Sequence, residues 1–169
     1  MAIGSSAMCG TFKKEILAGI HRLTSSSRGD SSAISADTFK VAMFTNSSSI
    51  DADTAQYTTS NEVSGTNYTA GGAALSSVTI GLADNSSSVP TAFVDFADTT
   101  FSSSTISSAR GALIYNSTLS GASTGSTVTA LANPSVAVIN FDADKSSSAG
   151  DFTIQYPANN ANAAIIRIA

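Results

Sequence analysis

Few side chains in this sequence carry charge, and fewer still are positive. Charged residues occupy 12% of the 169 positions and the formal net charge is −4, whereas a globular protein usually has about twice that share of charged residues. A protein that binds nucleic acid presents a positive field to the phosphates. This composition supplies no such field, so we expect no nucleic-acid partner.

Cysteine and long apolar runs are also scarce. Cys9 is the single cysteine, which excludes a fold stapled by internal disulfides. No stretch of about 18 apolar residues occurs, so we expect no membrane span and no membrane partner. Residues 1–10 lack the basic and apolar regions of a secretory signal. We expect the chain to stay in the cytoplasm where it is made, or to be assembled there into something larger.

The sequence offers little material for catalysis. His21 is the single histidine, and no nearby carboxylate is expected to orient it, which is typical of a partly exposed helix histidine. No histidine follows in the strand-rich part of the chain to activate a serine nucleophile, and no glycine-rich loop stands between a strand and a helix with a phosphate-binding lysine. We therefore predict a non-enzymatic protein with no catalytic residues and no cofactor.

Three aspartates between Asp142 and Asp151 raise the question of calcium. An EF-hand loop starting at Asp142 would need glycine at its sixth position and glutamate at its twelfth. Those positions hold Ser147 and Thr153. We interpret the stretch as a hairpin loop and assign no metal ligand, while a weak calcium site of another kind stays open.

Serine and threonine are abundant, at 50 of the 169 positions, and they separate short apolar runs. Several runs alternate apolar and polar residues, as Val78, Ile80 and Leu82 do, and most are too short for helices. The predicted strands are Thr38–Phe44, Ser76–Leu82, Thr91–Phe96, Ala112–Tyr115, Ser135–Phe141, Phe152–Tyr156 and Ala164–Ile168, with Thr127–Leu131 as a further candidate. The pattern predicts a mainly β fold, an antiparallel β-sandwich of jelly-roll type with seven to eight short strands. The serine clusters, including 102–104 and 146–148, are expected to be loops.

An amphipathic helix is predicted before the strands, over residues 11–23. Its apolar residues recur at helical spacing, and its lysines lie off that stripe. A helix this short needs a surface to dock on, either the rest of the domain or a partner. As a hypothesis, it anchors the chain to a partner through Phe12, Lys13, Lys14, Ile16, Leu17, Ile20 and Leu23.

The charges also distinguish the N-terminal part of the chain from the part with the predicted strands. Five of the eight basic residues lie at or before Lys40, and none lies between Val41 and Ala109, where six acidic residues fall. Such polarity can orient identical subunits or steer docking, although in a chain with so few charges it can equally arise by chance. We predict an N-terminal segment, residues 1–37, with the helix and a polar linker, followed by a β-sandwich domain over residues 38–169.

The chain resembles a family of small structural proteins of tailed bacteriophages. The motifs that carry the resemblance follow one another over nearly the whole chain, at Cys9–His21, Asp37–Ala42, Glu62–Gly72, Ala109–Asn116, Gly150–Pro157 and Ile165–Ile168. The resemblance implies a virion protein that is assembled in the host cytoplasm and packs against other virion proteins, with a homo-oligomer expected. It brings no catalytic or binding residue with it.

Three functions remain open from the sequence. The first is a capsid decoration (cement) protein that packs on the head shell, with the major capsid protein as its partner. The second is a tail, neck or fibre-associated structural component, with tail or neck proteins as partners. The third is a binding module or adhesin, or a small hydrolase.

Overall fold

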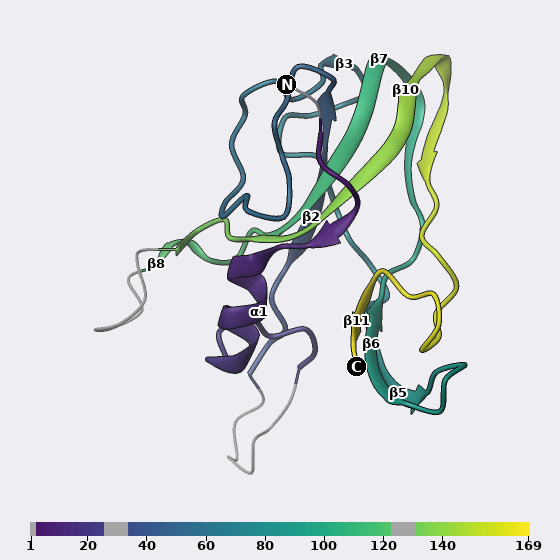
Figure 1. Cartoon of the computed structure of the whole chain (residues 1–169). Coiled ribbons are helices and arrows are strands. Elements are labelled where there is room, and N and C mark those ends of the chain that lie inside the picture. The colour runs from purple at the N-terminus through teal and green to yellow at the C-terminus, as the bar shows by residue number, and fades with distance from the viewer. Residues whose placement is uncertain (1–2, 26–33, 123–130) are drawn as a thin grey trace.

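The computed structural model describes residues 3–25, 34–122 and 131–169 (Figure 1). The fold is mainly β, with 49% of residues in strands and 5% helical, as the sequence predicts. The elements in chain order are β1 (Ala7–Met8), α1 (Gly10–Leu17), β2 (Phe39–Thr45), β3 (Gly65–Thr66), β4 (Ala73–Ala74), β5 (Thr79–Asp84), β6 (Pro90–Asp95), β7 (Thr99–Asn116), β8 (Ser120–Ala122), β9 (Leu131–Ala132), β10 (Ser135–Ile154) and β11 (Ile166–Ile168).

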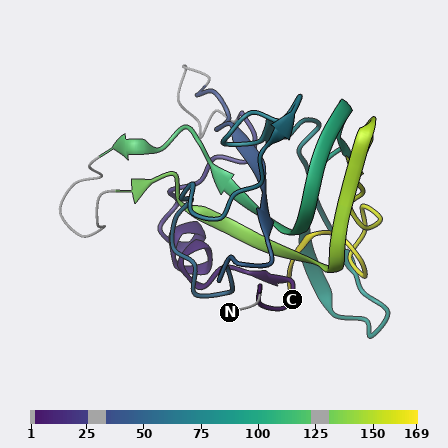
Figure 2. The same cartoon turned by 90° about the horizontal axis from the view of Figure 1, so that it is seen from above.

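Two antiparallel sheets form most of the molecule. The six-stranded sheet has the order β1-β10-β7-β2-β4, with β3 also paired to β7, and the three-stranded sheet has the order β11-β6-β5. The strands β8 and β9 pair separately. Figures 1 and 2 show β7 and β10 running side by side along the length of the larger sheet, with β5, β6 and β11 grouped beyond one end of it.

The strands β7 and β10 are longer than the sequence predicts, at 18 and 20 residues. The expected strand Ala112–Tyr115 is one end of β7, and the stretch Asp142–Asp151 is not a hairpin loop but the middle of β10. The serine clusters 102–104 and 146–148 are strand residues too. Several register shifts interrupt this ladder, and Asp142 and Ala149 take positive φ values of 62° and 50°. Such bulges let a strand continue through residues that favour turns.

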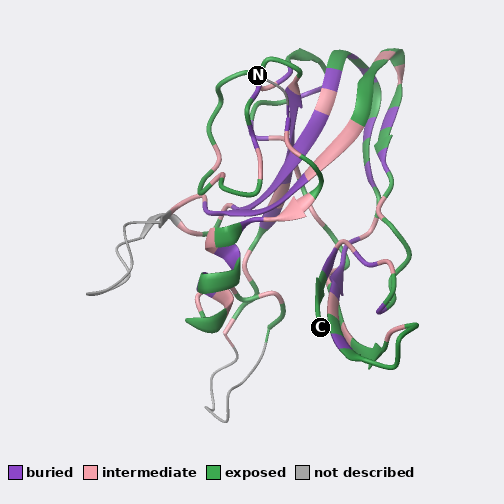
Figure 3. Cartoon of the chain, viewed as in Figure 1, coloured by how far each residue is buried: buried purple, intermediate pink, exposed green. Residues whose placement is uncertain are grey.

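The core surrounds β2 on both sides. Phe39, Val41, Ala42, Met43 and Phe44 are all buried, although alternate residues of a strand point to opposite faces. The ring of Phe39 packs near His21 and Phe96, whereas the ring of Phe44, on the opposite face, packs near Tyr57. Figure 3 shows buried residues along β2 and β7, whereas β5 is exposed along nearly all of its length.

The helix α1 ends earlier than predicted, at Leu17 rather than at residue 23. Gly19 adopts φ 67°, the left-handed conformation that terminates helices, and its amide donates to the carbonyl of Ile16. Residues 20–25 continue as irregular chain.

No break in packing corresponds to the expected boundary at residues 37 and 38. The strand β1 pairs with β10, and Cys9 and Phe12 lie fully buried in the core that the other strands share. The N-terminal segment is thus part of the same folded body. Most of the candidate strand Thr127–Leu131 falls outside the described residues, and β9 begins at its last residue.

Candidate functional site

The seven predicted anchoring residues divide between the interior and the surface. Phe12 has no exposed surface, and Ile16 and Leu23 pack partly buried against the core. Ile20 is half-buried, whereas Lys13 and Lys14 are exposed. Leu17 is 90% exposed. The apolar stripe thus docks on the chain's own body, and the part of the helix open to a partner is Lys13, Lys14 and Leu17, which we call the α1 patch.

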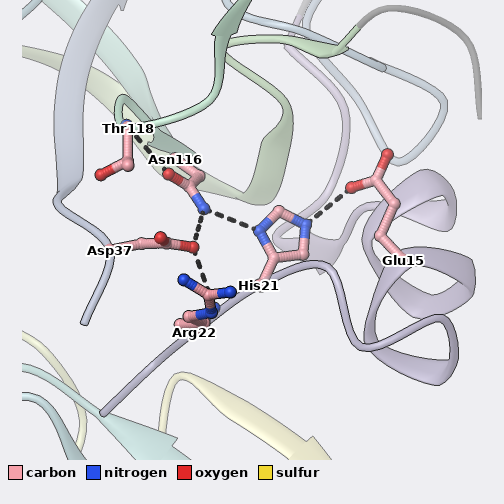
Figure 4. Close-up of polar contacts among 6 residues, drawn as sticks. All are labelled: Glu15, His21, Arg22, Asp37, Asn116 and Thr118. Atoms are coloured by element: carbon pink, nitrogen blue, oxygen red, sulfur yellow. Dashed lines mark hydrogen bonds and ion pairs between the residues drawn. The ribbon is translucent and has the colours of Figure 1, made fainter. Parts of the chain in front are cut away.

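His21 lies in a buried polar network rather than on the surface of a helix (Figure 4). Its side chain has no exposed surface, and its Nε2 lies 2.7 Å from Oε2 of Glu15, which is itself buried. On the other side of the ring, Nδ2 of Asn116 lies 3.0 Å from Nδ1. The expectation that no carboxylate orients His21 was wrong, because the chain folds back after Gly19 and returns the ring toward Glu15.

The hydrogen bonds around Asn116 determine where the proton of His21 lies. The amide Nδ2 also donates to Oδ2 of Asp37 at 2.7 Å, and the amide oxygen accepts from the backbone N–H of Thr118 at 3.0 Å. With both Nδ2 protons directed in this way, Nδ1 of His21 must accept. In this arrangement the Nε2–H of His21 donates to the Glu15 carboxylate.

This network contains the residue types of a catalytic proton relay, but it has no ring nitrogen that is free to contact a substrate. Both ring nitrogens of His21 are engaged, and the ring packs near Phe12 and Phe39 at centroid distances of 4.8 and 6.2 Å. Burial raises the pKa of the Cys9 thiol to about 12, which leaves it protonated at neutral pH. The arrangement holds α1, the start of β2 and the end of β7 together, and it leaves no lone pair of the ring free for a substrate.

A second polar cluster lies on the opposite face of the larger sheet. The Glu62 carboxylate accepts hydrogen bonds from the hydroxyls of Tyr57 and Tyr68, at 2.6 and 2.7 Å, and from the amide of Gly71 at 2.8 Å. Tyr115 donates to the carbonyl of Gly71 at 2.7 Å and stacks on Tyr57. Burial, followed by the neighbouring Glu62 carboxylate, raises the pKa of Tyr57 and of Tyr68. This cluster fastens the chain between β2 and β5 onto the sheet.

Two of the three aspartates of the suggested calcium stretch face protein donors. Asp144 lies 3.6 Å from the guanidinium of Arg110, and Asp151 accepts from the backbone N–H of Ser103. Within residues 3–25, 34–122 and 131–169, no three acidic, histidine or cysteine side chains come together as a metal site. In the same ranges, no helix has the length and apolar character needed to cross a bilayer.

The smaller sheet carries an exposed apolar face that the sequence pattern did not predict. Opposed residues of paired strands share a face, so Ile80, Val94 and Ile166 form one row and Leu82, Ala92 and Ile168 form the next. The first row reaches the core, because Val94 and Ile166 are buried. The second row does not, with Leu82 at 74% and Ile168 at 47% exposed.

The alternation of Val78, Ile80 and Leu82 correctly marks a strand but not its environment. An alternating pattern is typical of a strand with one face on the core, yet Ile80 is 52% exposed. Asp84 follows on the same face, since it is two residues beyond Leu82. We call Ile80, Leu82 and Asp84 the β5 patch.

Comparison of the chain with protein-family models, with curated proteins and with solved structures gives no match. The candidate site comprises the two hydrogen-bonded polar clusters around His21 and Glu62 and the two apolar patches on the surface.

Proposed function

We propose that this protein is a non-enzymatic structural component of a tailed-bacteriophage virion, with capsid decoration as its preferred role. In this role it packs on the head shell against the major capsid protein, in many copies that also contact one another. The resemblance of its motifs to small phage structural proteins supports the proposal. We further infer a sandwich-like arrangement, in which the six-stranded and three-stranded sheets contribute to one core.

The observation that carries the proposal is the contrast between interior and surface. His21, Glu15 and Glu62 are side chains of the kind that perform acid–base chemistry, but they form their hydrogen bonds with other groups of the same chain. Among the residues that the structure describes, the most exposed of the large apolar side chains are Leu17 and Leu82. Apolar surface that stays exposed in a folded chain favours contact with another macromolecule.

The copy number of the chain in purified particles tests the proposal. Mass spectrometry of gradient-purified virions, calibrated against the major capsid protein, measures it directly. A decoration protein is expected at a copy number comparable to that of the major capsid protein. A few copies per particle would overturn decoration in favour of the tail or neck role.

Absence of the chain from purified particles would overturn the virion proposal as a whole. The control is a host cytoplasmic protein of similar abundance, measured in the same fractions. Its level gives the amount of contamination that the gradient leaves behind.

A further inference from the structure

We propose that two copies of this chain associate through the α1 patch of one and the β5 patch of the other. The proposal rests on the expectation of a multi-copy structural protein and adds the surfaces by which the copies meet. The two patches carry the most exposed leucines of the described residues, Leu17 at 90% and Leu82 at 74%.

The α1 patch is basic and apolar. Leu17 lies four residues after Lys13 and three after Lys14, so the three side chains are neighbours on one side of the helix. The acid of this helix, Glu15, points inward to His21 and is buried. The exposed surface of α1 therefore has two positive charges and one uncovered leucine.

The β5 patch is acidic and apolar. Ile80, Leu82 and Asp84 alternate onto one face of β5. Arg167, the nearest cation in this sheet, belongs to the opposite face, because it is paired with Phe93 in the row of Gly81. No lysine or arginine occurs between Val41 and Ala109, so nothing on β5 or β6 offsets Asp84 on this face.

Charge complementarity is what selects a second copy as the occupant of each patch. Leu17 can cover Leu82 while Lys13 and Lys14 approach Asp84, whereas two α1 patches would set lysines against lysines. A stable dimer needs about 800 Å² from each partner, and each of these patches presents one highly exposed leucine. The contact is thus weak between free chains and persistent where many copies are held side by side.

Sedimentation velocity of the purified full chain tests the contact, over a concentration range from about 10 µM to about 1 mM. The wild-type chain should associate as concentration rises, and less so at high salt, because screening weakens the attraction between lysine and aspartate. Leu17→Asp and Leu82→Asp should each weaken association at least about tenfold. Ala83→Asp, on the opposite face of β5, and Lys145→Glu, outside both patches, are the matched controls.

Mixing the two leucine variants identifies the pairing. Leu17→Asp keeps its β5 patch and Leu82→Asp keeps its α1 patch, so an equimolar mixture should form a mixed dimer that neither variant forms alone. In a single chain, adding Asp84→Lys to Lys13→Glu and Lys14→Glu should restore part of the association that the lysine changes remove.

Three results would overturn the contact: a wild-type chain that stays monomeric over the whole range, a mixture that does not associate, or loss of association in Leu82→Asp but not in Leu17→Asp. The last result would instead indicate pairing of two β5 edges. These outcomes are independent of the copy number in virions, so the proposed function and the contact can fail separately.

Discussion

The imidazole of His21 joins three segments that are far apart in the sequence. Its Nε2–H donates to Glu15 of α1, and its Nδ1 accepts from Asn116 at the end of β7, which in turn donates to Asp37 just before β2. Removing the ring leaves the buried Glu15 carboxylate without its donor. The free-energy cost of such a group is larger than that of the hydrogen bond itself.

We expect His21→Ala to lower the free energy of unfolding by about 3 kcal/mol, measured by urea denaturation at pH 7. Leu17→Ala is the matched control in the same segment and should change it by less than about 0.5 kcal/mol, because Leu17 is 90% exposed. An equal effect of the two substitutions would contradict the structural role of the network.

The four tyrosines should make the protein sensitive to alkali. Burial raises the pKa of Tyr115 and of Tyr156 to about 12, and Tyr57 and Tyr68 shift in the same direction. The unfolded chain releases these protons near pH 10, so above that pH it binds fewer protons than the folded chain. The free energy of unfolding should therefore be unaffected by these groups below about pH 9 and should fall as the pH rises from about 10 to 12.

Absorbance of tyrosinate at 295 nm measures this difference directly. At pH 10.5 the native protein should show much less tyrosinate than the same protein in concentrated urea, where roughly three-quarters of the tyrosines are ionised. Equal absorbance in the two states would show that the hydroxyls ionise freely.

Cys9 should be inert in the native protein. Burial raises the pKa of its thiol to about 12 from 9.0, which lowers the thiolate fraction at pH 8 about a thousandfold, and the side chain has no exposed surface. A disulfide reagent such as DTNB should react within seconds with the chain unfolded in urea. Without urea, it should react only as fast as the native protein unfolds enough to expose Cys9. Labelling at the same rate in both conditions would contradict the burial.

At the scale of elements, two glycines with the same backbone angle differ in what surrounds them. Gly72 and Gly19 both have φ 67°. A Cβ on Gly72 would lie 1.8 Å from the carbonyl oxygen of Val41 in β2, whereas a Cβ on Gly19 would have nothing within 4 Å. The close approach at Gly72 brings the chain before β4 onto β2.

We expect Gly72→Ala to prevent folding or to destabilise it by more than about 3 kcal/mol, because the clash is with backbone that cannot move aside. Gly19→Ala carries the cost of the positive φ alone, about 1 kcal/mol. Thermal unfolding followed by circular dichroism measures both. Similar melting temperatures for the two variants would contradict the close approach.

The apolar patterns predict some elements well and miss others for identifiable reasons. The expected strands Thr38–Phe44 and Thr91–Phe96 differ from β2 and β6 by a single residue at each end, because both have apolar side chains in regular positions. The middle of the β7–β10 ladder is missed, because its serines bond across the strands, as Ser104 Oγ does with Ser147 Oγ at 2.8 Å. Serine favours turns locally, and only the tertiary pairing overrides that preference.

The site was harder to predict than the sheets. The partners of His21 are 6 and 95 residues away along the chain, and neither spacing forms a known motif. Leu17 and Phe12 were both expected to anchor the helix to a partner, yet Leu17 is exposed and Phe12 is buried. The sequence pattern shows that a helix has an apolar side, but it does not tell which part of that side the chain itself covers.

At the scale of the whole molecule, the N-terminal segment is required for the fold rather than appended to it. The strand β1 pairs with β10, and Cys9 and Phe12 belong to the core. The sequence predicts this segment as an anchor distinct from the β-sandwich domain, whereas these contacts predict that the two cannot be separated.

Deleting residues 1–23 should therefore give a chain that aggregates or is digested rapidly by trypsin. The double variant Lys13→Glu, Lys14→Glu is the matched control, since both lysines are exposed and the variant should remain as resistant as the wild type. A stable, soluble truncated body would contradict this prediction and support the separable arm.

The pairing of β1 with β10 also determines when the protein can fold. Ala7 and Met8 lie opposite Val138 and Ala137, so β1 pairs with a strand about 130 residues later in the chain. Likewise β2 must wait for β7, about 70 residues later. Contacts between residues so far apart along the chain are slow to form. The nascent chain therefore keeps Phe12 and Phe39 uncovered until β7 and β10 have been made, and the larger sheet can close only after that point.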